Sequence, residues 1–348
     1  MGCILKMIDN EKNLKTIYNF VNTYLSPKSC GFDHIKEFDE EELLGPALDL
    51  LNVTQQTLLT HYCDTKVVEK TTNPVMYEKF DKNIEGVKAA KYITRNVLYD
   101  ASPITHVLAH GSQVDGTFVT GWSDFDVIFI IDLTKLKSPA DFIKLRKAVI
   151  SATSALSFID PLCHHYFQII PSCFIQNLSK SMLPPSILSE SIFLHDRNDR
   201  LLVSYTEEYD PGSLRKIQNL FRTSYADGVM YHHDRNNVYL EDEFRNYKDN
   251  MYQLKYFYSL VALLPALYYN QKDLNYSKSD AIDNIKQELK HKIDMSILFD
   301  STNIRRDWGM LKLGKPIDNQ VPKYILDSIG KNYFYRATRF IDELCDRV

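Results

Sequence analysis

Apolar residues recur with a helical period near the beginning of the chain and again along its last third. Ile17, Val21 and Leu25, for example, lie four positions apart and so share one face of a helix. The same period predicts four later helices, over residues 214–230, 241–269, 279–292 and 324–345. We therefore expect an N-terminal helical region over residues 1–85 and a C-terminal helical bundle over residues 206–348.

The pattern differs between residues 86 and 205, where short apolar runs alternate with loops and helices. Helices are expected over Gly86–Tyr99 and from Pro139 to about Phe158. Three short runs have the composition of strands: Ile104–Ala109, Val127–Ile131 and His164–Ile170. This order predicts an α+β fold, in which residues 86–205 form a small mixed β-sheet with helices against one face.

Composition and charge narrow the classes of partner. The chain has 44% hydrophobic and 25% charged residues, which is the balance of a folded globular protein. Its net charge of -4 and pI near 6.2 do not supply the basic surface that a large nucleic-acid footprint needs. We therefore do not expect a long nucleic acid as partner, although local basic patches stay possible.

Cysteine usage and apolar run length bear on location. The six cysteines include no CxxC pair, which is typical of free thiols in a reducing cytoplasm. The first residues do not resemble a signal peptide. The longest apolar run, Ser259–Tyr269, is shorter than the roughly 20 residues that span a bilayer. A cytoplasmic protein without a membrane partner is expected.

The stretch that carries chemistry is His110-Gly111-Ser112, followed after eleven residues by Asp124-Phe125-Asp126. Residues i and i+2 of a strand point to the same face, so Asp124 and Asp126 present two carboxylates side by side. Such oxygens suit Mg²⁺ or Mn²⁺, and a metal held there can stabilise the charges of phosphoryl or nucleotidyl transfer. An Asp-x-Asp pair alone would be a weak signal, because acidic pairs also occur in solvated turns.

The residues around the acidic pair strengthen the signal. Gly111 allows the backbone to approach an anion closely, and Ser112 adds a hydroxyl at the expected start of a short helix, whose N–H groups favour phosphate. Ser123 either donates a second hydrogen bond to a ligand or orders the turn. The combination favours a functional site over an incidental acidic turn.

At these residues the chain resembles the DNA polymerase beta-like nucleotidyltransferase superfamily, whose signature is a Gly-Ser, a spacer of this length and an Asp-x-Asp leading into a strand. The resemblance covers residues 86–205. It implies a nucleoside triphosphate donor, with ATP the first choice, and transfer of the nucleoside monophosphate to a hydroxyl with release of pyrophosphate. Asp124 and Asp126 would hold the metal, and Gly111 and Ser112 the phosphates.

The resemblance extends to the C-terminal bundle, where Leu263–Tyr268 and Tyr276–Ser279 look like second-domain helices of bacterial members. In such enzymes a lysine of this region faces the triphosphate. Lys278 is the corresponding candidate, and an ordinary surface lysine is the alternative reading of it.

The chain departs from the family at the third carboxylate, which members usually carry on the strand after the helix. Residues 163–170 contain no Asp or Glu. Alternation puts His164 and His165 on opposite faces, so only one of them can point toward the acidic pair. His164 shares its face with polar residues and is favoured as ligand or general base. A packed or surface role for either histidine is the alternative.

Three hypotheses about function follow. The first is a metal-dependent nucleotidyltransferase with a small-molecule or protein acceptor. The second is a non-catalytic nucleotide-binding or partner-binding module that has lost turnover with the third carboxylate. The third is a plain interaction scaffold, for which no sequence signal speaks. A further pair, His232-His233, is expected at a helix end or in a loop and is assigned a structural role.

Overall fold

The computed structural model of the chain describes residues 10–25, 67–70, 84–119, 121–159, 166–175, 178, 183–194, 201–205, 212–227, 232–233, 239–240, 251–308 and 331–348. The chain divides into two compact units. The first contains Met1–Thr117, Asp124–Leu178 and Leu188–Glu207, and the second contains Phe118–Ser123, Ser179–Ile187 and Glu208–Val348. The predicted division at residues 85 and 205 stays a prediction.

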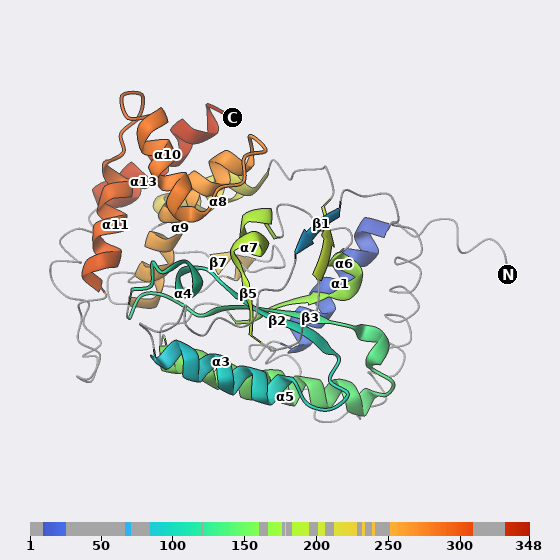
Figure 1. The fold of residues 1–348 in the computed structure, drawn as a ribbon. Coiled ribbons are helices and arrows are strands. Elements are labelled where there is room, and N and C mark those ends of the chain that lie inside the picture. The colour runs from blue at the N-terminus through green and yellow to red at the C-terminus, as the bar shows by residue number, and fades with distance from the viewer. Residues whose placement is uncertain are drawn as a thin grey trace, which may run out of the picture. The chain divides into compact units, whose positions relative to one another are not determined.

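A four-stranded sheet forms the centre of the first unit, with strand order β4-β3-β2-β5 (Figure 1). Its strands are β2 (Ile104–His110), β3 (Asp126–Ile131), β4 (Gln168–Pro171) and β5 (Ile192–Phe193). β2 runs antiparallel to β3 and β5, whereas β3 and β4 are parallel. The expected α+β class with a small mixed sheet is thus confirmed, and so are the strands predicted at Ile104 and Val127.

Two long helices of the first unit lie side by side along one face of this sheet (Figure 1). They are α3 (Ile84–Val97) and α5 (Pro139–Ile159), close to the ranges that the helical period predicts. Each buries an apolar stripe, such as Ala90 and Ile93 in α3 and Leu145 and Val149 in α5. Because the apolar stripes face inward, the charged residues of both helices are left on the outside.

The edge of the sheet at β4 is covered by α1 (Asn10–Leu25). The side-chain amide of Asn22 donates to the carbonyl of Ile169 at 2.8 Å and accepts from its N–H at 3.3 Å. Tyr24 of the same helix stacks on Phe142 of α5, with ring centroids 4.7 Å apart. The Asn22 amide therefore pairs with both backbone groups of Ile169 at the edge of the sheet, where a neighbouring strand would otherwise be needed.

Two strand predictions for this unit need correction. The strand expected over His164–Ile170 begins only at Gln168, while His164 and His165 lie outside the described residues. In the N-terminal region that was expected to be helical, β1 (Val67–Lys70) pairs antiparallel with β6 (Leu201–Ser204). A four-residue strand whose partner lies more than 130 positions away has no local period that a sequence pattern can detect.

The shorter elements of the first unit complete its connections. They are α4 (Ser112–Asp115), the 3₁₀ turn η4 (Leu133–Lys135) and α6 (Ser172–Ile175). A further short helix, α7 (Pro185–Glu190), includes residues of both units. α4 starts directly after β2, as expected for the residues that follow Gly111.

The second unit is mainly helical, as predicted. Its helices are α8 (Gly212–Asp227), α9 (Met251–Asn270), α10 (Lys278–Glu288), α11 (Ser296–Trp308) and α13 (Lys331–Cys345). A small hairpin-like pair, β7 (His232–His233) and β8 (Tyr239–Leu240), contradicts the loop or helix end expected at His232-His233. Two-residue ladders carry no period, so the sequence does not indicate them. Within the described part of the chain, no helix is long and apolar enough to cross a membrane.

Candidate functional site

Gly111 directly follows β2 and has a backbone conformation that essentially only glycine adopts. Its φ is 71° and its ψ is -157°. A methyl group on its Cα would lie 2.5 Å from Oδ2 of Asp126, far inside van der Waals contact. The backbone of Gly111 therefore lies directly against the Asp126 carboxylate. The torsion angles require glycine at this position, and a larger residue would in addition have to displace the Asp126 side chain.

The two aspartates of the motif lie at the start of β3. Asp126 is the first residue of β3, and Asp124 precedes the strand by two positions. Phe125 between them is buried at 2% exposure, whereas both aspartates are half-buried. One buried residue thus separates the two half-buried aspartates, and the shared side of their carboxylates, which the Asp-x-Asp spacing predicts, stays a prediction.

The loop between the two halves of the motif is held by its own side chains. Asp115 Oδ1 accepts from the N–H of Thr117 at 2.8 Å and from its hydroxyl at 2.6 Å. Ser123 Oγ accepts from the N–H of Val119 at 2.9 Å, and Ser123 is only 4% exposed. Of the two roles open to Ser123, the structure shows the ordering of the turn; a bond to a ligand stays a prediction.

Trp122 fixes the same loop within the second unit. Its ring lies 6.2 Å from that of Tyr258 in α9, and Tyr258 contacts Tyr333 of α13 edge-on at 5.0 Å. Tyr333 in turn shares a 2.7 Å hydrogen bond with Ser301. The chain passes from the second unit to the first between Ser123 and Asp124, immediately before the acidic pair. Sequence reasoning missed Trp122, although its place inside the motif was a usable signal.

The pairing register adds neighbours that the sequence does not reveal. His110 lies directly opposite Asp126 across the β2–β3 pair. Directly opposite residues project to the same face, so the imidazole and the carboxylate are neighbours. On the other side, Gln168 of β4 is in register with Ile128, two positions after Asp126. His110 and Gln168 thus join Asp126 on one face of the sheet.

Two of the remaining candidates begin helices. Ser112 is the first residue of α4, next to Gly111. Lys278 is the first residue of α10 in the second unit and is exposed, after Ser277, whose hydroxyl caps the helix by accepting from the N–H of Asp280. A phosphate role for Lys278 stays a prediction, as does a role for His164 or His165, which lie outside the described residues.

A metal ion at this site would be bound by few protein side chains. Across the described ranges, no group of three or more His, Cys, Asp or Glu side chains is placed to hold a metal ion. Asp124 and Asp126 would therefore supply only two carboxylates. This set fits Mg²⁺, which is commonly bound by one or two carboxylates and completes its shell with waters and substrate phosphates.

The two cysteines that the structure describes, Cys173 and Cys345, are free thiols. Burial raises the pKa of Cys173 to about 12 and that of Cys345 to about 11. Thiols with such pKa values are almost wholly protonated at neutral pH, so neither is a candidate nucleophile.

No protein-family model matches this chain, and no curated protein or solved structure matches it significantly. The resemblance to the polymerase beta-like nucleotidyltransferases rests on the residues of the motif alone. The geometry around Gly111 and Asp126 is accordingly the main basis for a functional proposal.

Proposed function

We propose that the protein is a metal-dependent nucleotidyltransferase of the polymerase beta-like type. The observation that carries the proposal is the contact of the Gly111 backbone with the Asp126 carboxylate, where any larger residue would collide. Glycine adopts these torsion angles without strain and lets the backbone come close to the carboxylate, and a site that binds metal and phosphate needs such a close approach of backbone and ligand. An incidental acidic turn would not require it.

Each residue of the motif has a role in this proposal. Asp124 and Asp126 would hold Mg²⁺ or Mn²⁺, which supplies positive charge to stabilise the phosphates during transfer. Gly111 and Ser112 would bind the triphosphate through backbone and hydroxyl donors. His110, opposite Asp126, would orient that carboxylate and limit its rotation. Lys278, and His164 or His165, remain candidates for neutralising the triphosphate and for replacing the third carboxylate.

The proposed reaction joins the α-phosphorus of the donor to a hydroxyl oxygen of the acceptor. The bond from that phosphorus to the bridging oxygen breaks, pyrophosphate leaves, and the hydroxyl proton passes to a base or to water. ATP is the leading candidate for the donor. A small molecule or a protein is favoured as acceptor.

Titration calorimetry of the four ribonucleoside triphosphates, with and without Mg²⁺, tests the site directly. Wild type is expected to bind at least one of them in a Mg²⁺-dependent manner. The double variant Asp124→Asn/Asp126→Asn should lose at least about tenfold in affinity, equal to about 1.4 kcal/mol. Asp100→Asn is the matched control, because Asp100 is an exposed aspartate of the same unit outside the motif.

Two results would contradict the proposal. One is the absence of binding by wild type to any triphosphate, and the other is equal affinity in the double variant and in wild type. If binding is found, a screen of acceptors for pyrophosphate release follows, and the release should vanish in Asp126→Asn.

A second function is favoured by one specific observation, the lack of any carboxylate in residues 163–170. We infer as the alternative a non-catalytic module that binds a nucleotide or a partner on the same scaffold. Such a module would bind nucleotide equally with and without Mg²⁺ and would release no pyrophosphate with any acceptor.

A further inference from the structure

The outer surface of the α3–α5 layer carries a local excess of positive charge. Five basic residues of these two helices are exposed: Lys88, Lys91, Arg95, Lys144 and Lys147. The same helices contain two acidic residues. Glu85 forms an ion pair with Lys88 at 2.9 Å. Asp141 accepts hydrogen bonds from the backbone N–H groups of Lys137 and Ser138, which directly precede α5. The layer is therefore basic although the whole chain has a net charge of -4.

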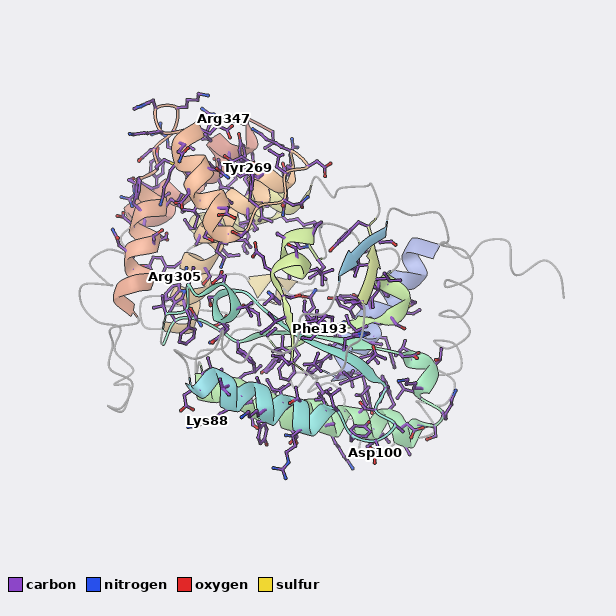
Figure 2. The ribbon with its side chains drawn as sticks, viewed as in Figure 1. Lys88, Asp100, Phe193, Tyr269, Arg305 and Arg347 are labelled. Carbon is purple, nitrogen blue, oxygen red and sulfur yellow. The ribbon has the colours of Figure 1, made fainter. Side chains whose placement is uncertain are left out.

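The basic residues form one continuous surface instead of scattered points. In α3 they recur at spacings of three and four, which puts them on one helix face. Ser151 of α5 donates to Asn96 of α3 at 3.1 Å, and hydrogen bonds with Ser154 and Ser151 lower the pKa of Tyr92. These contacts join the outer stripes of the two helices. Figure 2 labels Lys88 and Asp100 near the two ends of this layer.

The spacing and type of the groups on this surface favour a nucleic-acid duplex over a lipid bilayer as the polyanion that it binds. Seven residues of helix separate Lys88 from Arg95, or about 10 Å, and a nucleic-acid duplex presents about six phosphate charges over such a length. Hydroxyl and amide groups of Ser151, Ser154 and Asn96 lie between the cations, and such groups commonly contact phosphates and sugars. Tyr92, at 41% exposure, is the single large apolar side chain exposed among the described residues of α3 and α5. The surface therefore offers little to insert into a bilayer.

We propose that the outer face of α3 and α5 binds the phosphate backbone of a nucleic-acid duplex, without reading its sequence. The proposal is independent of the nucleotidyltransferase assignment. It refines the expectation drawn from net charge, because that total conceals a local surplus. Because Lys88 is shared with Glu85, about four phosphate contacts are expected, which predict micromolar rather than nanomolar affinity and a steep dependence on salt.

Fluorescence anisotropy with a labelled 20-base-pair RNA duplex and a DNA duplex of equal length tests the proposal. Binding by wild type should weaken with salt, with a slope of log K against log salt of about -4. The charge-reversal variant Lys91→Glu/Arg95→Glu/Lys147→Glu should bind at least tenfold more weakly and show a shallower slope. The milder variant Lys91→Gln/Arg95→Gln/Lys147→Gln should fall between them, and it guards against a loss of folding in the first.

The control variant Arg215→Glu/Lys290→Glu/Lys292→Glu makes the same change in net charge at exposed residues of the second unit. It should bind the duplexes within about twofold of wild type. Equal weakening in both charge-reversal variants would overturn the proposal, since only net charge would then matter. So would the absence of duplex binding by wild type at 50 mM salt, or tighter binding to phosphatidylserine vesicles than to either duplex.

Discussion

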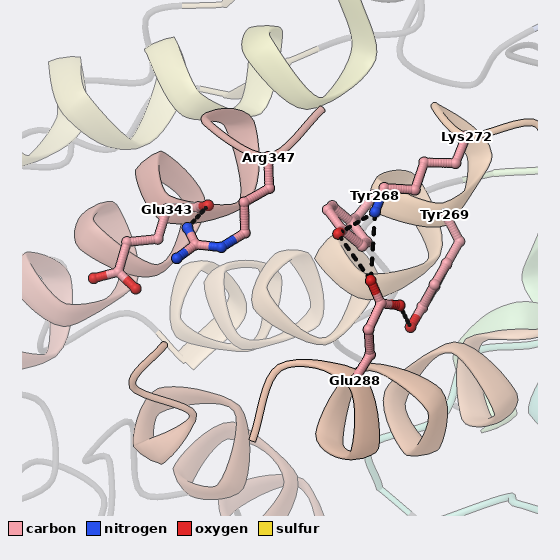
Figure 3. Close-up of polar contacts among 6 residues, drawn as sticks. All are labelled: Tyr268, Tyr269, Lys272, Glu288, Glu343 and Arg347. Atoms are coloured by element: carbon pink, nitrogen blue, oxygen red, sulfur yellow. Dashed lines mark hydrogen bonds and ion pairs between the residues drawn. The ribbon is translucent and has the colours of Figure 1, made fainter. Parts of the chain in front are cut away.

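The surroundings of Asp126 and the junction of α9 and α10 both gather polar groups, but they are held together by different means. At the junction, long side chains meet around Glu288 (Figure 3). Tyr269 donates to Glu288 Oε2 at 2.7 Å, Tyr268 donates to Oε1 at 3.3 Å, and the Lys272 ammonium lies 3.5 Å from Oε1. Lys272 also contacts the hydroxyl and the ring of Tyr268. At Asp126, by contrast, one close neighbour is the backbone of Gly111.

A structural cluster and a candidate site can be told apart by what holds their groups in place. Around Glu288 the partners of the carboxylate are groups on other side chains. If one partner is lost, rotation of the remaining side chains can partly compensate for it. Around Asp126 the close approach of the Gly111 backbone depends on torsion angles that another residue can adopt only with strain. We therefore expect substitutions near Asp126 to have large effects and substitutions near Glu288 to have small ones.

The largest effect is expected for Gly111→Ala. The substitution forces a non-glycine residue into a glycine-only conformation and drives its methyl group to 2.5 Å from Asp126 Oδ2. Strain and overpacking together should lower the free energy of unfolding by about 3 kcal/mol or more. Chemical denaturation followed by circular dichroism measures this loss. Mg²⁺-dependent nucleotide binding, if present in wild type, should be lost as well.

Gly116→Ala is the reference for a positive φ without a close neighbour. Gly116 also has a positive φ, of 80°, but it lies in the ordinary left-handed region and nothing lies within 4 Å of an added methyl group. We expect a loss of about 1 kcal/mol from the torsion angle alone. Equal losses in the two variants would mean that neither the torsion angles of Gly111 nor its approach to Asp126 adds to the cost of an ordinary left-handed residue, and the comparison would fail.

The sequence predicted a good part of this site because its signals are local. The apolar runs of β2 and β3 and the short helix after Gly111 both follow from spacings of a few residues. The close approach of the Gly111 backbone to a bound phosphate stays a prediction, while within the chain this backbone lies against the Asp126 carboxylate.

Other features could not be predicted, because they depend on which distant segments meet. His110 becomes a neighbour of Asp126 only through the register of two strands, which the intervening loop does not fix. The pairing of β1 with β6 and the packing of Trp122 on Tyr258 are likewise set by tertiary structure. Patterns along the chain indicate helices and strands, whereas contacts between residues far apart in the sequence are known only from the three-dimensional structure.

A smaller effect is expected for Ser123→Ala. The substitution removes the acceptor of the Val119 N–H in a loop position that is 4% exposed. The loss of a hydrogen bond that leaves a part-buried donor unsatisfied should lower the free energy of unfolding by about 1–2 kcal/mol. Thermal and urea denaturation measure it. A loss of nucleotide affinity without a loss of stability would instead assign Ser123 to the ligand.

The smallest effect is expected for Glu288→Gln, and its pH dependence is its signature. Burial acts to raise the pKa of Glu288, but hydrogen bonds from Tyr269 and the charge of Lys272 outweigh it, so the pKa lies below its ordinary value of 4.5. A lowered pKa in the folded state means that the carboxylate stabilises the fold fully above pH 4.5. This contribution is lost as the pH falls through the lowered value.

The Glu288 side chain is 40% exposed and the ion pair with Lys272 is screened by solvent, so the variant should lose only about 0.5 kcal/mol at pH 7. The difference between wild type and Glu288→Gln, measured by urea denaturation, should be equal at pH 7 and pH 5.5 and should shrink below pH 4.5. Asp283→Asn is the control, since its pair with Lys286 lies on the same helix with Asp283 at 74% exposure, and no measurable change is expected there. A loss of several kcal/mol in Glu288→Gln would show that the junction is as rigidly constrained as the Asp126 site, and flexibility of the neighbours would no longer distinguish the two.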